Sequence, residues 1–370
     1  MEATLTKVTV PTVVLRDLVA RAVKGSTNVD LIPMSSLMNI KIQDGKMYVN
    51  TTDNVNYLTT FAEVTADNFE MTVLSKIFSQ TVSKLTSENT TFTIEGNKVL
   101  IEANGKYNLN IERDSDGSAV KFPEIEIEAV GTTYHLKPEE IRSILTLSKS
   151  CKGEKNEVPT IVHNYYMDNK GVLTTNYYKA CSNPIVLTDD AILVSNFVMD
   201  LVSVVADDSG VDVYQDSDYI VFESTKGKLI GKKVEEVSDY PATDLSNLIS
   251  NELAYSVQMN RTLFIQAVDR MCLFVDAYEQ NRLYLTFTKD GLSLYSSKTD
   301  SSELVNYINI NTPIESEVKF SVDCMHLKNQ LTACDKEDLT VRFSDEVGLQ
   351  IKCGETTLML GLLNEAEDIV

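Results

Sequence analysis

Residues able to carry out acid–base or metal chemistry are scattered in this sequence. Neighbouring carboxylates occur at Asp189-Asp190, Asp207-Asp208 and Glu235-Glu236, where turns or element ends are expected, and they are interpreted as solvated charge. The six cysteines and three histidines include no Cys-x-x-Cys pair. We therefore expect reduced, mostly buried cysteines, with neither a zinc site nor a disulfide framework. With no phosphate-cradling glycine loop or nucleophile elbow either, the sequence predicts a protein that is not an enzyme and needs no metal or cofactor.

Weak contact with phosphate is the second chemistry that the residues indicate. The formal charge of −21 argues against a broadly basic surface that coats nucleic acid. Lys and Arg nevertheless recur opposite the apolar face of several expected helices. A solvated polar face explains any one such helix, but recurrence at equivalent helices favours a lining that touches phosphate without reading bases. The predicted DNA-facing residues are Arg16, Lys24, Lys76, Lys84, Arg142, Lys149, Arg270 and Lys328.

Three copies of one series of elements position these residues. Each copy has an amphipathic helix, a strand pair with a glycine turn, a second amphipathic helix and another strand pair. The first helices are expected at 11–25, 137–153 and 260–279, and the second helices follow 73–78, 193–198 and 322–327. This repetition predicts an α+β fold with domains at 1–128, 129–250 and 251–370, each with two helices on one side of antiparallel sheets. Open edge strands would then invite pairing with another chain, and a rotation that closes gives a ring.

The sequence contains no apolar segment long enough to span a membrane. The hydrophobic fraction is 43% of 370 residues, and charged or polar residues interrupt every apolar run. The first residues lack the basic start and apolar core of an export signal. We therefore expect a cytoplasmic protein without membrane contact.

Over essentially its whole length the chain resembles the beta sliding clamp family of bacterial DNA polymerase III. The similar segments are Leu31-Ile32-Pro33-Met34, Lys121-Phe122-Pro123, Cys181-Ser182-Asn183-Pro184-Ile185, Tyr240-Pro241 and Asn281-Arg282-Leu283-Tyr284-Leu285. The resemblance implies a replication processivity factor: a head-to-tail homodimer forming a six-domain ring around double-stranded DNA. It implies DNA polymerase, the clamp loader and other clamp-binding-motif proteins as partners. The alternative is a clamp-fold scaffold or decoy that binds replication partners without encircling DNA.

The resemblance also implies two protein-binding surfaces. At the dimer interface it places Tyr107, Leu109, Cys272, Leu273 and Phe274. In a pocket for a short partner peptide it places Thr174, Asn176, Tyr178, Pro241, Leu245, Leu358, Leu360 and Leu362. Ordinary core packing is the alternative explanation for both sets.

Two segments depart from the family pattern. The last strand, usually similar to Met-Pro-Met-Arg, has the sequence Leu360-Gly361-Leu362-Leu363 and is followed by the acidic tail 364–370. In the second domain, Asn176, Tyr177 and Tyr178 replace basic and small residues. These departures predict a divergent member, such as one encoded by a phage or plasmid, with a peptide motif tuned to this clamp.

Overall fold

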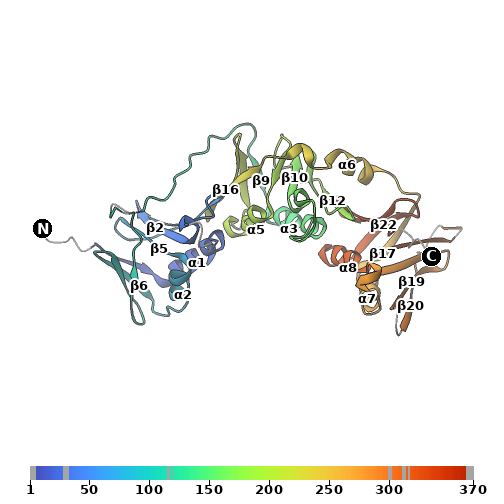
Figure 1. The fold of residues 1–370 in the computed structure, drawn as a ribbon, viewed down its shortest axis with the longest axis horizontal. Coiled ribbons are helices and arrows are strands. Elements are labelled where there is room, and N and C mark those ends of the chain that lie inside the picture. The colour runs from blue at the N-terminus through green and yellow to red at the C-terminus, as the bar shows by residue number, and fades with distance from the viewer. Residues whose placement is uncertain are drawn as a thin grey trace. The chain divides into compact units, whose positions relative to one another are not determined.

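The computed structural model of the chain divides into two compact units, and each is described separately (Figure 1). Unit 1 comprises residues 1–141 and 197–233, and unit 2 comprises residues 142–196 and 234–370. The structure describes residues 6–27, 33–114, 117, 118, 120–298, 302–310, 314, 315 and 317–363. Leu31 and Ile32 of the first similar segment, and the acidic tail 364–370, lie outside the described residues.

Unit 1 contains two antiparallel sheets. The strand order is β1-β6-β7-β8 in one sheet and β9-β14-β15-β16-β4-β3-β2-β5 in the other. The first sheet consists of β1 (Thr6–Pro11), β6 (Asn89–Glu95), β7 (Lys98–Glu102) and β8 (Lys106–Asn110). The second consists of β2 (Leu37–Gln43), β3 (Lys46–Thr52), β4 (Tyr57–Glu63), β5 (Phe69–Leu74), β9 (Tyr134–Leu136), β14 (Val211–Gln215), β15 (Tyr219–Glu223) and β16 (Gly227–Val234). The pairing of β16 with β4 is antiparallel, with Leu229 opposite Leu58.

Helix α1 (Thr12–Ala22) continues directly from β1 because Pro11, whose extended backbone ends the strand, stands at its N-cap. Its apolar residues Leu15, Leu18 and Ala22 are fully buried in the unit 1 core. The helix packs on β3, β4 and the neighbouring helix α2 (Ser75–Ser83). The remaining helical segments of this part of the chain are η1 (Val23–Gly25), η2 (Pro33–Ser36) and α5 (Asn196–Val205).

Unit 2 also contains two antiparallel sheets, with strand orders β17-β22-β23-β24-β12-β11-β10-β13 and β20-β19-β18-β21. The first consists of β10 (Tyr165–Asp168), β11 (Gly171–Thr175), β12 (Lys179–Asn183), β13 (Ile192–Val194), β17 (Tyr255–Asn260), β22 (Asp338–Ser344), β23 (Gly348–Cys353) and β24 (Thr356–Gly361). The second consists of β18 (Arg282–Thr288), β19 (Gly291–Lys298), β20 (Ser302–Ile308) and β21 (Val318–Asp323). The antiparallel pairing of β12 with β24 joins segments that are far apart in the sequence, with Lys179 opposite Leu360.

The long helices of unit 2 are α6 (Ala242–Ser250), α7 (Arg261–Met271) and α8 (Cys324–Ala333). Helices α7 and α8 pack against each other, and side-chain caps begin both: Asn260 accepts from the Leu263 N–H and Asp323 accepts from the His326 N–H. The other helical segments are α3 (Pro138–Ser143), at the division between the units, η3 (Ile144–Ser148), α4 (Lys149–Cys151), η4 (Thr160–His163), η5 (Val237–Asp239) and η6 (Ala277–Glu279). Within the described residues, no helix is long and apolar enough to cross a membrane.

The structure confirms the α+β class and the three expected glycine turns. The helix expected at 260–279 is wrong in its second half. It ends at Met271, and a turn through Cys272 leads to the separate segment η6. Helix α6 was not predicted. The boundaries near 128 and 250 stay a prediction.

The expectation that all cysteines are reduced is wrong for one pair. Cys334, just after α8, forms a disulfide with Cys353 at the end of β23, with Cα atoms 5.9 Å apart. The fold brings the helix end beside the strand end, a proximity that cysteine spacing alone does not reveal. Cys151, Cys181 and Cys324 are free and buried, as expected, and Cys272 is half-buried.

Candidate functional site

A cavity of about 240 Å³ in unit 2 contains two of the predicted pocket residues, Tyr178 and Leu360. Leu360 lies at the end of β24 and is almost fully buried, whereas Tyr178 is 63% exposed. Strand pairing brings them together, because the Gly361 N–H donates to the Tyr178 carbonyl oxygen at 2.8 Å. The remaining lining residues are Glu157, Gln280, Asp323, His326, Gly361 and Leu363. The cavity thus combines an apolar floor, an aromatic wall and several polar side chains, a composition suited to a peptide.

The hairpin between β11 and β12 holds Tyr178 in its exposed position. The Asn176 side chain accepts from the N–H groups of Tyr178 and Lys179 at 3.1 and 3.0 Å. Tyr177, between Asn176 and Tyr178, adopts the left-handed conformation with φ of 73°. This Asx-type turn fixes the backbone of the hairpin that carries the exposed tyrosine ring.

The other predicted pocket residues have different environments. Thr174 is buried and donates from its hydroxyl to the Ser148 carbonyl, and Leu358 is fully buried in the unit 2 core. Leu362 packs against that core and is partly buried. Pro241 is the N-cap of α6, and Leu245 belongs to a separate apolar cluster around Tyr240. Of the eight residues in that prediction, the described lining of the cavity includes Tyr178 and Leu360.

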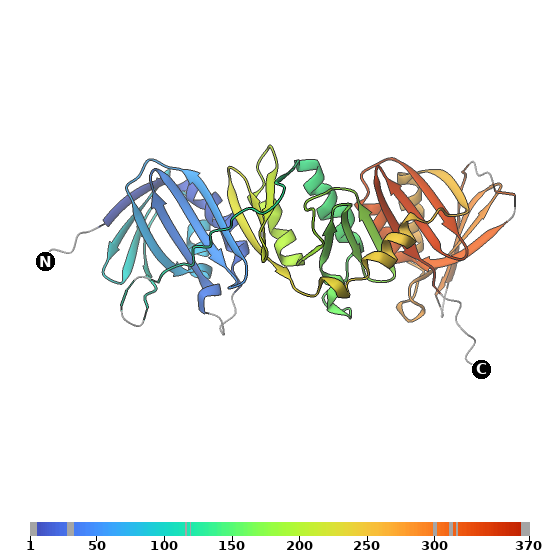
Figure 2. The same ribbon diagram turned by 90° about the horizontal axis from the view of Figure 1, so that it is seen from above.

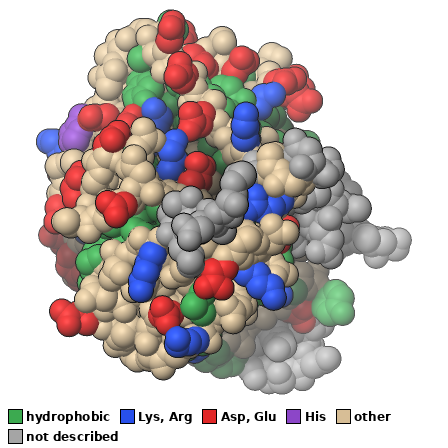
Figure 3. All heavy atoms as spheres, turned by 90° about the vertical axis from the view of Figure 1, so that its left-hand side faces the viewer, with side chains coloured by type: hydrophobic (Ala, Val, Ile, Leu, Met, Phe, Trp, Pro, Cys, Tyr) green, Lys and Arg blue, Asp and Glu red, His purple; other side chains and the backbone are tan. Residues whose placement is uncertain are grey.

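The four predicted DNA-facing residues of unit 1 lie on two helices that touch each other. Arg16 and Lys24 are exposed on α1 and just beyond it, and Lys76 and Lys84 are exposed on α2 and at its C-cap. None of these four residues forms an ion pair with another described residue. Arg21 on α1, in contrast, forms an ion pair with Asp17 at 2.8 Å. Figure 3 views a different face, the left-hand side of Figure 1, and there Lys and Arg are interspersed with Asp and Glu rather than gathered in one continuous patch.

The basic residues of unit 2 are less uniform. Arg142, Lys149 and Arg270 are exposed. Lys328 on α8 instead forms an ion pair with Asp269 on α7, at 2.5 Å. Hydrogen bonding to Asp269 raises the pKa of Lys328, so its positive charge is partly balanced before any phosphate approaches.

Two of the five residues expected at a dimer seam lie on an edge strand of unit 1. Tyr107 and Leu109 occupy β8, which pairs only with β7 among the described strands, and both are half-buried against the unit 1 core. In unit 2, Leu273 is 73% exposed, Phe274 is half-buried, and Cys272 lies with its Sγ atom 3.0 Å from that of Cys324. The described edge strand β20 exposes Val305 and Tyr307.

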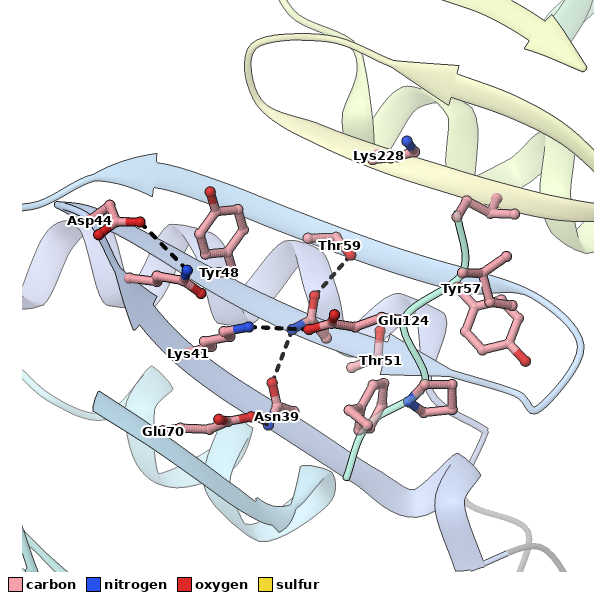
Figure 4. A pocket seen from close by; sticks show the side chains of 16 residues that line it. Asn39, Lys41, Asp44, Tyr48, Thr51, Tyr57, Thr59, Glu70, Glu124 and Lys228 are labelled. Atoms are coloured by element: carbon pink, nitrogen blue, oxygen red, sulfur yellow. Dashed lines mark hydrogen bonds and ion pairs between the residues drawn. The ribbon is translucent and has the colours of Figure 1, made fainter. Parts of the chain in front are cut away.

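Sequence reasoning missed a second cavity, of about 340 Å³, on the sheet of unit 1 (Figure 4). A chain of hydrogen bonds crosses its floor, from Thr59 to Asn50 at 2.8 Å and from Asn50 to Asn39 at 3.0 Å. Glu124, from the segment that crosses the strands in Figure 2, pairs with Lys41 at 3.1 Å. The ion pair with Lys41 is thus a link between the crossing segment and the sheet.

Asp207 was interpreted as solvated charge, but it organises a loop of unit 1. One carboxylate oxygen accepts from the Ser209 N–H and hydroxyl at 2.8 and 2.6 Å, and the other accepts from the Thr225 N–H and hydroxyl at 3.1 and 2.6 Å. These hydrogen bonds hold the pKa of Asp207 well below its ordinary value. An Asp-Ser-Gly sequence is a turn signal that could have revealed this role. In the described part of the chain, His, Cys, Asp and Glu form no group able to hold a metal ion.

Several solved structures with this fold are DNA polymerase III beta subunits or DNA polymerase sliding clamps. The beta subunit of DNA polymerase III from Thermotoga maritima matches with a TM-score of 0.82 at 15% identity, covering 97% of this chain and 100% of that chain. The beta subunit from DNA polymerase of Streptococcus pyogenes matches with a TM-score of 0.84 at 15% identity, covering 97% of this chain and 100% of that chain. The DNA polymerase sliding clamp from Bacillus subtilis matches with a TM-score of 0.84 at 16% identity, covering 98% of this chain and 100% of that chain. No protein-family model and no curated protein matches the sequence.

The chain therefore has the fold of a DNA sliding clamp. More narrowly, the fold is that of the bacterial DNA polymerase III beta subunit over nearly the whole chain, which confirms the resemblance seen in the sequence at the level of fold.

Proposed function

We propose that this chain is a DNA sliding clamp, a non-catalytic processivity factor that encircles duplex DNA and tethers a DNA polymerase. The observation that carries the proposal is the coverage of the structural match, which includes 97% of this chain and 100% of the Thermotoga subunit. A fold retained from end to end at 15% identity supports a function that depends on the shape of the whole molecule. The protein would act in the cytoplasm, with the three domains 1–128, 129–250 and 251–370.

Ring closure in this proposal takes place between two copies of the chain, head to tail. The edge strand β8 with Tyr107 and Leu109 would meet the partner near Cys272, Leu273 and Phe274. The outer edge of β8, which no other described strand pairs with, and an exposed leucine support this assignment. Gel filtration with light scattering should give a dimer, and Leu273→Asp should give a folded monomer. A wild-type chain that stays monomeric at micromolar concentration would contradict the ring.

Within the ring, the exposed basic residues of the helices would touch phosphate weakly. The exposed Arg16, Lys24, Lys76 and Lys84 support this role, and the ion-paired Lys328 would contribute least. Because the whole chain is acidic, contact confined to the lining would hold DNA without halting movement along it.

Encirclement is tested on circular DNA. Monomers mixed with a nicked circle at low concentration and then concentrated can close around it without a loader. The proposal expects the protein to remain on the circle in high salt and to dissociate once the circle is cut. Equal retention on circular and linear DNA would favour the alternative, a clamp-fold scaffold or decoy that binds replication partners without encircling DNA.

Partner proteins would bind through a peptide in the cavity of Tyr178 and Leu360. The support is its apolar floor beside an exposed aromatic ring at a junction of paired strands. DNA polymerase, a clamp loader and other clamp-binding-motif proteins are the proposed partners.

A further inference from the structure

The polar side chains around the Tyr178 cavity are rich in hydrogen-bond acceptors. Glu157 and Asp323 contribute carboxylates and His326 contributes an imidazole. Neither Lys nor Arg occurs among the described lining residues. A ligand entering this cavity therefore meets net negative charge directly beside an apolar floor.

The Glu157 carboxylate is held in place by neighbouring donors. Asn176 donates to it at 2.8 Å, and the Glu154 N–H donates at 2.6 Å. Asn176 is the same side chain that shapes the Tyr178 turn. The carboxylate and the aromatic wall are thus positioned together, before any ligand arrives.

Asp323 and His326 begin helix α8 on another side of the cavity. Asp323 caps the helix through the His326 N–H at 2.9 Å, and its other oxygen lies 3.4 Å from the Asn281 side-chain nitrogen. The Nδ1 atom of His326 is buried and has no hydrogen-bond partner among the described residues, and the nearby Asp323 carboxylate oxygen is 4.0 Å away from it. A buried polar atom without a hydrogen bond costs free energy, which a ligand that bonds to it would recover.

The surroundings of His326 lower the pKa of its ring. Burial is the main cause that lowers its pKa, and the positive charge of Lys179 lowers it further, while Asp323, Glu157 and Glu154 act in the opposite direction. A neutral imidazole adds no positive charge to the two carboxylates. The buried Lys179 supplies one positive charge against the two carboxylates of Glu157 and Asp323, so the net charge around His326 is negative.

We propose that the partner peptide of this chain places a Lys or Arg side chain between Glu157 and Asp323, next to an apolar side chain on Leu360. This inference rests on the proposed function, since it names the chemistry of the peptide that the clamp would bind. A guanidinium suits the site best, because it donates several N–H groups in a plane and stays charged.

The preference for a cationic side chain can be tested with short acetylated peptides that contain two adjacent leucines and one variable residue. The variable residue, on either side of the leucines, is arginine, its neutral isostere citrulline, or glutamate. With the full-length protein, the arginine peptide should bind about tenfold tighter than the citrulline peptide and the glutamate peptide should bind weakest. The preference should shrink as ionic strength rises, since part of it is screened.

Conservative variants locate the preference in the cavity. Glu157→Gln keeps an acceptor for Asn176, and Asp323→Asn keeps a helix cap, so both are expected to fold. Each should lower the arginine-to-citrulline ratio about threefold. Glu252→Gln, which removes an exposed carboxylate outside the cavity lining, should leave the ratio unchanged.

Two outcomes overturn the inference and differ in what they say of the proposed function. Equal binding of the arginine and citrulline peptides, with both abolished in Tyr178→Ala, means a peptide pocket that does not select a cation. No binding by any peptide overturns the inference too, and retention on circular DNA then decides independently whether the chain is a clamp.

Discussion

Gly361 and Tyr178 meet through their main chains: the Gly361 N–H donates to the Tyr178 carbonyl oxygen at 2.8 Å, and the Cβ position of Gly361 lies 3.2 Å from that oxygen. Gly361→Ala should therefore push the hairpin of Tyr178 away and weaken this bond, at a cost of about 1 kcal/mol in unfolding free energy. We expect faster hydrogen exchange at the residue 361 amide and weaker peptide binding. Unchanged exchange would show that the hairpin yields without loss.

Tyr178→Ala separates peptide binding from folding. The ring is 63% exposed, so its removal should leave stability within about 0.5 kcal/mol and still abolish peptide binding. Leu360→Ala is the contrasting change, because burial of Leu360 predicts a loss of about 2–5 kcal/mol. Denaturant unfolding and titration of a bound peptide measure the two effects. Both variants should remain dimeric, and a peptide affinity unchanged in Tyr178→Ala would remove the site assignment.

Replacing the basic residues of α1 and α2 should weaken the binding of DNA. Arg16, Lys24, Lys76 and Lys84 changed together to Gln should reduce the slope of log affinity against log salt by about 0.9 for each phosphate that the variant no longer neutralises. The control changes Lys170 and Lys289, which are exposed in hairpin turns of unit 2, so it removes two positive charges where the first variant removes four. An equal decrease per charge removed in the two variants would indicate a non-specific charge effect rather than a lining.

Asp207 should make stability depend on acid pH. Its pKa is lower in the folded protein than in the unfolded chain, so its contribution is complete above about pH 4 and disappears as the pH falls towards the folded value. Asp207→Asn should be less stable by about 1 kcal/mol at pH 7, with the difference shrinking below pH 4. Asp208→Asn is the control, because Asp208 is exposed and its salt bridge to Lys226 is long at 3.5 Å.

The thiols of Cys272 and Cys324 should form a disulfide with oxidised glutathione. The Cys272 thiolate attacks one glutathione sulfur and releases reduced glutathione, and Cys324 then displaces the second. Contact between the Sγ atoms at 3.0 Å favours the second step. Hydrogen bonding from Cys324 lowers the pKa of Cys272, which makes it the attacking thiol. Peptide mapping should find this cross-link while the buried Cys151 and Cys181 stay reduced. A stable mixed disulfide at Cys272 would contradict it.

Much of the fold could be predicted because its signals are local. Alternating apolar residues flank Asp290-Gly291, and Phe264, Ala267, Val268 and Met271 have helical spacing, so pattern alone identified β18, β19 and α7. Helix α6 was missed although Leu245 and Ile249 have helical spacing, because the preceding Tyr240-Pro241 suggested only a strand end.

The site was harder to predict because its parts are distant in the sequence. Tyr178 and Leu360 were named through family resemblance, but the charges beside them depend on contacts that no periodicity encodes. A hydrogen bond from Asn176 positions Glu157 at the cavity, and Asp323 lines the cavity because it is the N-cap residue of α8. The disulfide of Cys334 depends in the same way on the meeting of a helix end with a strand end.

The pairing of β12 with β24 has a consequence for how such proteins diverge. Main-chain hydrogen bonds set the position of the cavity floor, and they are indifferent to which side chains the two strands carry. Substitutions around the cavity can therefore alter what it recognises while its outline persists. A clamp and its partner peptides can in this way evolve a binding specificity that the clamps of a competing replication system do not share, without any change of fold.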